Sequence, residues 1–177
     1  MTYSVQPMPL HGPLFKGAIR VYGEAFAEPP YSDPLRGQEV SQRLRDLHHR
    51  RRGYRALVAL SETGGVLGMA YGYCSETGQW WHDTVARRLA PEVAEDWLGD
   101  AYELVEIAVA PTSQGMGIGT ELIHRLLDGI AQRTCVLSTR PDSTAPRLYE
   151  REGFMTVTEM LFTPNGAPFL IMGKRLR

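Results

Sequence analysis

The sequence has few cysteines, no long hydrophobic run and almost no net charge. Its two cysteines, Cys74 and Cys135, are too few and too scattered to indicate a disulfide framework or a zinc site. No apolar stretch approaches the roughly 20 residues that a membrane-spanning helix needs, and residues 1–5 lack the basic and apolar regions of a secretion signal. We therefore expect a cytoplasmic protein that does not act on membranes.

A formal net charge of -1 gives no electrostatic reason to expect nucleic acid as a partner. His82 and His124 lack the spacing of metal ligands, so we expect no metal site. The 177 residues, of which 43% are hydrophobic and 22% charged, have the composition of an ordinary globular protein. This length suits one well-buried domain, and residues 1–177 contain no repeat or linker that would divide them.

Apolar periodicity and turn residues predict strands and helices along the whole chain. The predicted strands cover 3–8, 54–60, 66–74, 102–110, 135–139, 154–162 and 168–172. The predicted helices cover 14–26, 37–51, 117–132 and 143–151, with a further short helix within 85–97. The strand at 102–110 is almost continuously apolar, so we expect it to be buried on both faces. This order of elements indicates a mixed α+β domain.

A glycine-dense turn joins the strand at 102–110 to the amphipathic helix that follows. Gly115, Gly117 and Gly119 let the backbone approach a ligand closely. The free N–H groups and the dipole at a helix start favour an anion, so we expect a pyrophosphate there. The alternative is that these glycines only pack the helix tightly on the sheet.

The residues after the last glycine decide between three nucleotide motifs. A P-loop would need Lys after Gly119, where this chain has Thr120. The spacing is G-x-G-x-G, which differs from the G-x-G-x-x-G of a dinucleotide site. The pattern Gln114-x-x-Gly117-x-Gly119 fits the pyrophosphate of coenzyme A.

Together with a second segment downstream, this loop resembles the GNAT superfamily of N-acetyltransferases. The second segment is Asp142-x-x-Ala145-x-x-x-Tyr149-Glu150-x-x-Gly153-Phe154, where the family often has Asn in place of Asp142. The resemblance implies a mostly antiparallel central sheet of about seven strands flanked by helices, with a splay between the fourth and fifth strands. It also implies acetyl-CoA as the co-substrate and direct transfer of the acetyl group to an amine.

The resemblance assigns the residues that would hold acetyl-CoA and act on its thioester. The expected cofactor-binding residues are Ile107, Ala108, Val109, Gln114, Gly115, Met116, Gly117, Ile118, Gly119, Thr120 and Asp142. The backbone N–H of Val109 would stabilise the thioester oxyanion, and Tyr149 would protonate the leaving sulfur. The alternative for Tyr149 is that its ring only packs between helix and sheet.

Two carboxylates in the apolar strand are candidates for the base that takes the ammonium proton. Burying Glu103 or Glu106 costs several kcal/mol unless the side chain is paired or functional. In a regular strand the two point to opposite faces, whereas a bulge would bring both to the substrate. We favour Glu106 over Glu103, and the alternative for each is a paired structural carboxylate.

The acceptor is harder to predict than the cofactor. By the resemblance, Tyr31 and Trp81 lie in segments that line the acceptor site, although each could equally cover the core. We expect acetyl transfer from acetyl-CoA to a primary amine of a small molecule. The alternatives are a protein acetyltransferase that modifies an N-terminus or a lysine, and an acyl-CoA-binding sensor without turnover. A homodimer is left open.

Overall fold

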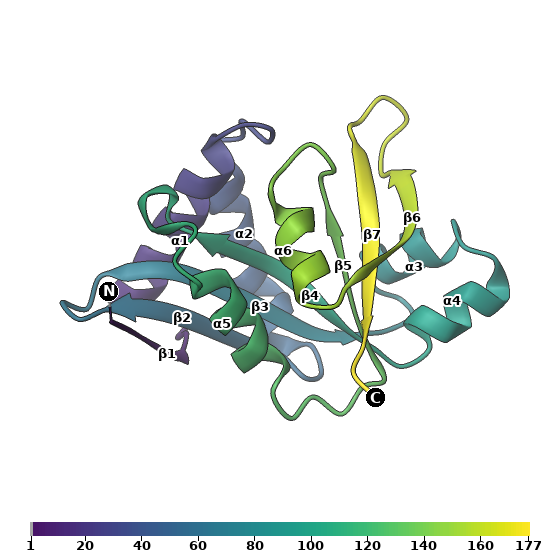
Figure 1. Cartoon of the computed structure of the whole chain (residues 1–177), viewed down its shortest axis with the longest axis horizontal. Coiled ribbons are helices and arrows are strands. Elements are labelled where there is room, and N and C mark those ends of the chain that lie inside the picture. The colour runs from purple at the N-terminus through teal and green to yellow at the C-terminus, as the bar shows by residue number, and fades with distance from the viewer. Residues whose placement is uncertain (1) are drawn as a thin grey trace. The chain divides into compact units, whose positions relative to one another are not determined.

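A computed structural model describes residues 2–177 of the chain, and Figure 1 shows its ribbon. Within these residues seven strands form one sheet in the order β1-β2-β3-β4-β5-β7-β6. The strands are β1 Tyr3–Pro7, β2 Arg55–Ser61, β3 Val66–Ser75, β4 Ala101–Val109, β5 Thr134–Thr139, β6 Met155–Leu161 and β7 Pro168–Arg175. The helices are α1 Gly12–Ala27, α2 Arg36–Asp46, α3 Trp80–Ala86, α4 Pro91–Leu98, α5 Ile118–Leu127 and α6 Ala145–Arg151. Two 3-10 turns, η1 His48–Arg50 and η2 Pro111–Ser113, complete the set.

The pairing of the strands confirms the predicted mixed, mostly antiparallel sheet. β1 with β2, β2 with β3, β5 with β7 and β6 with β7 are antiparallel, whereas β4 and β5 run parallel. The β4–β5 register runs from Ala101 opposite Thr134 to Glu103 opposite Val136, and both strands continue beyond these pairs. The predicted splay between the fourth and fifth strands begins there.

The chain divides into two compact units that share β4. The first unit comprises the chain up to Tyr73 together with Val105–Asp128, and the second comprises Cys74–Leu104 and Gly129–Arg177. The single domain over residues 1–177 stays a prediction.

In the first unit, helices cover both faces of the sheet. α1 and α2 lie on one face and α5 lies on the other (Figure 1). On the α1 side, a Cβ added at Gly17 would lie 2.6 Å from Val66 of β3. On the α5 side, a Cβ at Gly68 would lie 3.2 Å from both Ile118 and Leu122. Glycine at these two positions therefore allows the helices to approach β3 closely on both faces.

The second unit is built around its own apolar cluster. Trp81, Trp97, Val136 and Ile171 are buried together in it. A Cβ at Gly173 would lie 2.5 Å from ring carbons of Trp97, so the indole packs directly on the backbone of β7. Figure 1 shows α6 on one face of the strands of this unit and α3 and α4 on the other.

Three predicted helices have different bounds in the structure. The helix predicted at 37–51 ends at Asp46, and η1 follows, because the chain turns inward to bury His48 against Tyr71. The helix predicted at 117–132 ends at Leu127, where Arg55 Nη1 donates to the carbonyl oxygens of Leu126 and Asp128 at 2.9 and 2.6 Å. The ends of α2 and α5 are therefore fixed by tertiary contacts, which apolar periodicity does not reveal.

The third difference lies between β3 and β4. In place of one short helix within 85–97, the chain forms α3 and α4, and α4 begins at Pro91. Proline suits the first position of a helix because its missing N–H has no intrahelical partner there. Trp81 and His82, expected in a connecting segment, therefore lie on α3.

Burial of the central strand follows the prediction only in part. Residues 101–104 of β4 are all buried, as expected for a strand covered on both faces. Residues 105–109 alternate instead, with Glu106 and Ala108 buried and Val105, Ile107 and Val109 half-buried. In the second half of β4, one face is buried and the other is only partly covered.

No helix within residues 2–177 combines the length and the apolar character that crossing a bilayer requires.

Candidate functional site

The turn before α5 owes its shape to two glycines. Gly115 and Gly117 have φ values of 77° and 81°, in the left-handed region that other residues avoid. Gly117 is the N-cap of α5, and no side chain of the described residues caps this helix end. Residues 114–117 are exposed. The first-turn N–H groups of α5 are therefore available to an anion outside the protein.

Gln114 ties this turn back to the strand that precedes it. Its Nε2 donates to the carbonyl oxygen of Val109 at 3.2 Å. The backbone N–H of Ala110 donates to the carbonyl oxygen of Leu67 on β3 at 2.8 Å, so the sheet holds the start of the connection. The amide of Gln114 thus helps to fix the turn from inside.

Tight packing of α5 on the sheet depends on a glycine outside the turn. A Cβ at Gly68 would lie 3.0 Å from the carbonyl oxygen of Ala108 and against the side chains of α5. A Cβ at Gly115 would meet no atom within 4 Å, and one at Gly117 would come only within 3.9 Å of the Tyr3 hydroxyl. Backbone conformation, rather than close packing, accounts for these two glycines of the turn.

The Glu106 side chain points to the face that carries α1 and α2, where it meets two arginines of α2. Its Oε1 lies 3.6 Å from Nη2 of Arg43 and 4.0 Å from Nη2 of Arg36. Arg36 Nε also donates to the hydroxyl of Tyr22 at 2.8 Å. Glu106 is only 8% exposed, so these guanidinium groups offset the cost of burying its charge.

The groups around this carboxylate are uncharged apart from the arginines. Burial and then the Glu106 carboxylate raise the pKa of Tyr22 well above its ordinary value. Tyr71 is affected in the same way, so its pKa is also well above 10. Burial, together with Arg51 and Arg43, lowers the pKa of His48 to about 3. Both phenols and this imidazole are therefore neutral at neutral pH.

Tyr31 lies at the edge of this cluster. Its ring centroid is 4.6 Å from that of Phe26, and the Arg36 guanidinium carbon lies 5.0 Å from the Tyr31 ring centroid. The same guanidinium is 4.4 Å from the Phe26 ring centroid. The two aromatic rings thus hold Arg36 in place, which fits the cation–π preference of guanidinium groups.

Glu103 belongs to the second unit and has different surroundings from Glu106. It is buried, at 3% exposure, in the part of β4 that pairs with β5. Its charge adds to the effect of burial in raising the pKa of Cys135 to about 12. The bulge that would bring both carboxylates to one substrate stays a prediction.

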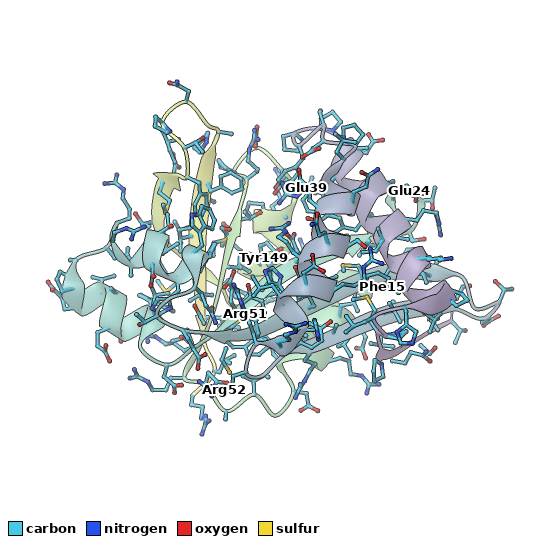
Figure 2. All side chains as sticks on the ribbon, turned by 180° about the vertical axis from the view of Figure 1, so that it is seen from behind. Phe15, Glu24, Glu39, Arg51, Arg52 and Tyr149 are labelled. Atoms are coloured by element: carbon cyan, nitrogen blue, oxygen red, sulfur yellow. The ribbon has the colours of Figure 1, made fainter. Side chains whose placement is uncertain are left out.

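Tyr149 and Asp142 also belong to the second unit. Tyr149 projects from α6 (Figure 2), is 5% exposed, and has its ring edge against Phe154 at a centroid distance of 5.7 Å. Asp142 accepts hydrogen bonds from Nε and Nη2 of Arg140 at 2.9 and 2.6 Å, which lower its pKa. The contact of Asp142 with the pantetheine arm stays a prediction.

Trp81 is part of the core of the second unit. It is 8% exposed, and its Nε1 donates to Ser138 Oγ at 3.1 Å. The adjacent Trp80 is 64% exposed and packs against Phe162. The assignment of Trp81 to the acceptor stays a prediction.

The cluster around Glu106 contains residues that sequence reasoning missed. Arg36, Arg43 and Tyr22 were not singled out, because a charged residue on a polar helix reads as solvated unless its partner is known. The seven-residue spacing of Arg36 and Arg43 was the one usable signal, since it puts both on the same face of a helix.

Sequence comparisons match this chain to acetyltransferases. The acetyltransferase (GNAT) domain family matches residues 52–156. A GCN5-like protein acetyltransferase of Mycobacterium tuberculosis is 32% identical over 190 residues, which cover 90% of this chain and 90% of that protein.

Solved structures match over nearly the whole chain. A GNAT-family acetyltransferase of Desulfovibrio desulfuricans matches with a TM-score of 0.71 and 20% identity, over 99% of this chain and 100% of that chain. A chain of the NatC complex bound to Gag peptide and CoA matches with a TM-score of 0.66 and 16% identity, over 100% of both chains. The sequence matches identify the family and these structures share its fold, so the chain belongs to the GNAT acetyltransferases.

Proposed function

We propose that the protein transfers an acetyl group from acetyl-CoA to the primary amine of a small molecule. The observation that carries this proposal is the exposed turn at residues 114–117, which opens directly into α5. Its two left-handed glycines and the uncapped helix start suit a pyrophosphate group. The family of the chain supplies acetyl-CoA as the donor that fits this site.

The proposed cofactor residues lie in this turn and the start of α5, at the end of β4 and at Asp142. Gln114, Gly115, Met116, Gly117, Ile118, Gly119 and Thr120 would hold the pyrophosphate, and Ile107, Ala108, Val109 and Asp142 the pantetheine arm. Acetyl-CoA, when bound, supplies a thioester carbonyl for attack and a thiolate as the leaving group. The backbone N–H of Val109 is the proposed donor to the oxyanion.

The proposed acid–base roles fall to three side chains. An ammonium with an unperturbed pKa of about 10 must lose its proton before it attacks, and Glu106 is the proposed acceptor of that proton. Glu103 is the second candidate. Tyr149 is the proposed donor of a proton to the leaving sulfur.

Glu106 lies on the face of β4 that carries α1 and α2, whereas α5 starts on the opposite face. In this proposal the acceptor amine approaches from the α2 side, and the pyrophosphate is held at the start of α5. The acceptor residues Tyr31 and Trp81 remain part of the proposal. Trp81→Phe should raise the KM of the acceptor and leave the affinity for acetyl-CoA unchanged.

A protein acetyltransferase is the second candidate function. The relative from Mycobacterium tuberculosis is named for that activity, and this favours an N-terminal amine or a lysine as the acceptor. Either acceptor would use the same donor and the same acid–base groups.

An acetyl-CoA-dependent assay of free thiol release separates these candidates. It should be run with panels of small amines and of short peptides, and paired with thermal melts in saturating acetyl-CoA. Binding of acetyl-CoA raises the melting temperature by mass action, and turnover with small amines supports the proposal. Turnover with peptides alone would assign the protein activity, and stabilisation without any turnover would indicate a sensor.

A further inference from the structure

Arg36 and Arg43 form a positively charged pair on one face of α2. Seven residues separate them, which is close to two helical turns. Their guanidinium groups both approach the same atom, Oε1 of Glu106, at 4.0 and 3.6 Å. Neither distance is that of a close hydrogen bond, so the carboxylate does not use up the donors of either guanidinium.

The charges of this cluster do not balance. Two guanidinium groups face one carboxylate, and His48 and the phenols of Tyr22 and Tyr71 are neutral. The cluster therefore carries one net positive charge next to the proposed base. A bound group of negative charge would pair with this excess, because guanidinium donors that Glu106 does not use remain for it.

The two arginines differ in freedom. Arg36 is held by the Tyr22 hydroxyl and by the rings of Phe26 and Tyr31, and its side chain is 26% exposed. Arg43 has a side chain that is 44% exposed and contacts Glu106 at 3.6 Å. Arg43 is thus the guanidinium that an incoming molecule can reach.

We propose that the acceptor is an amino acid, whose carboxylate binds Arg43 with support from Arg36 while its amine faces Glu106. This inference rests on the proposed function and names its substrate class. A guanidinium fork matches a carboxylate in two parallel hydrogen bonds. A bound amino acid adds one negative charge at the arginines and one ammonium at Glu106, so every charge in the cluster then has a partner.

The same charge pattern disfavours two other classes of amine. A polyamine would bring several positive charges to a cluster that already has an excess of one, and like charges repel. An internal peptide lysine has no carboxylate next to its amine to pair with Arg43. The cluster thus favours the small-molecule acceptor over the protein acceptor.

The test uses pairs of molecules that differ only in the carboxylate. Thiol release should be measured with phenylalanine against phenethylamine, lysine against cadaverine and glutamate against γ-aminobutyrate. In the third pair, γ-aminobutyrate lacks the carboxylate next to the amine but keeps the distal carboxylate of glutamate. We expect the wild-type kcat/KM for at least one amino acid to exceed that of its partner by about 10- to 100-fold, as for a lost charge-assisted hydrogen bond.

Three substitutions on α2 test whether Arg43 causes the preference for an amino acid over its decarboxylated amine. Arg43→Gln should remove it through a rise in KM for the amino acid, with a smaller change in kcat/KM for the decarboxylated amine, which Arg43 reaches only through Glu106. Arg43→Lys should restore only part of it, because an ammonium lacks the fork. Arg45→Gln is the matched control, since Arg45 lies on α2 near Phe15 and away from Glu106; it should leave the preference intact.

A binding measurement keeps the inference separate from the proposed function. The melting temperature should be recorded with each amino acid in the presence of CoA, for wild type and Arg43→Gln. Stabilisation that depends on Arg43 without thiol release would support the acceptor class and contradict the acetyl transfer. Turnover in which the amine and its amino acid have equal kcat/KM, or in which peptides or polyamines are preferred, would overturn the inference and leave acetyl transfer standing. Absence of both stabilisation and turnover with all of the amino acids would also overturn it.

Discussion

The glycine turn at residues 114–117 and the arginine cluster at Glu106 are two charged-group sites of different construction. The turn depends on backbone conformation, because Gly115 and Gly117 adopt positive φ and leave the first N–H groups of α5 open. The cluster depends on side chains that come from α1, α2 and β4. The conformation of the turn is determined by a few consecutive residues. The arginine cluster forms only when folding brings distant residues together.

The largest expected effect comes from breaking the turn. Gly117→Glu should reduce affinity for acetyl-CoA by about 100-fold, because it adds left-handed strain of about 1–2 kcal/mol and a negative charge where an anion would bind. The shift in melting temperature caused by acetyl-CoA measures it. Gly64→Glu is the matched control, since Gly64 in the β2–β3 turn has a φ of 83° and open space around it. If Gly64→Glu removed the shift equally, the effect would be loss of the fold.

The second test concerns the hydroxyl of Tyr149. Tyr149→Phe keeps the ring that packs against Phe154 and deletes only the proton donor. We expect kcat to fall about 100-fold, the low end for general acid catalysis, with KM nearly unchanged because the interaction forms in the transition state. A near-normal kcat in Tyr149→Phe would show that Tyr149 contributes only the packing of its ring.

The two strand carboxylates provide the third test. Glu106→Gln should lower the rate by about 10- to 100-fold and flatten its rise with pH, whereas Glu103→Gln should do less. Full pH profiles of kcat/KM for both variants measure the difference. Melting temperatures are needed beside them, since Glu106→Gln also leaves Arg36 and Arg43 without their carboxylate. If only Glu103→Gln changed the pH profile of kcat/KM, Glu103 would be the base and Glu106 the structural carboxylate.

The smallest expected effect is on stability and tests the neutral surroundings of the cluster. The pKa of His48 is lowered from 6.5 to about 3 in the fold, so the unfolded chain binds this proton first as the pH falls. Its contribution is complete above pH 6.5 and declines as the pH falls from 6.5 to about 3. By pH 5 the loss should reach about 1–2 kcal/mol in the free energy of unfolding.

Urea unfolding at pH 7 and pH 5 measures this loss. The groups that face His48 are Tyr71, Tyr73, Arg51 and Arg43. His48→Gln should show a smaller decrease between the two pH values than wild type. An equal decrease in His48→Gln would assign the pH dependence to other groups.

The sequence predicted the fold class and the glycine turn, and it missed the surroundings of Glu106. The mixed, mostly antiparallel sheet of seven strands is the one that the resemblance implied. The helix ends were wrong where a distant residue decides them, as Arg55 does for α5. Glu106 was singled out because a carboxylate in an apolar strand needs a reason, but its partners lie 70 and 63 residues away in the chain.

Local backbone preference is what the sequence by itself determined. Glycine is the residue that takes positive φ without strain, so the positions of Gly115 and Gly117 determine the conformation of the turn through local preference alone. The pairing of Arg36 and Arg43 with Glu106 was decided only by the tertiary structure. Side-chain electrostatics depends on distance and burial, and both are set when α2 packs on the sheet.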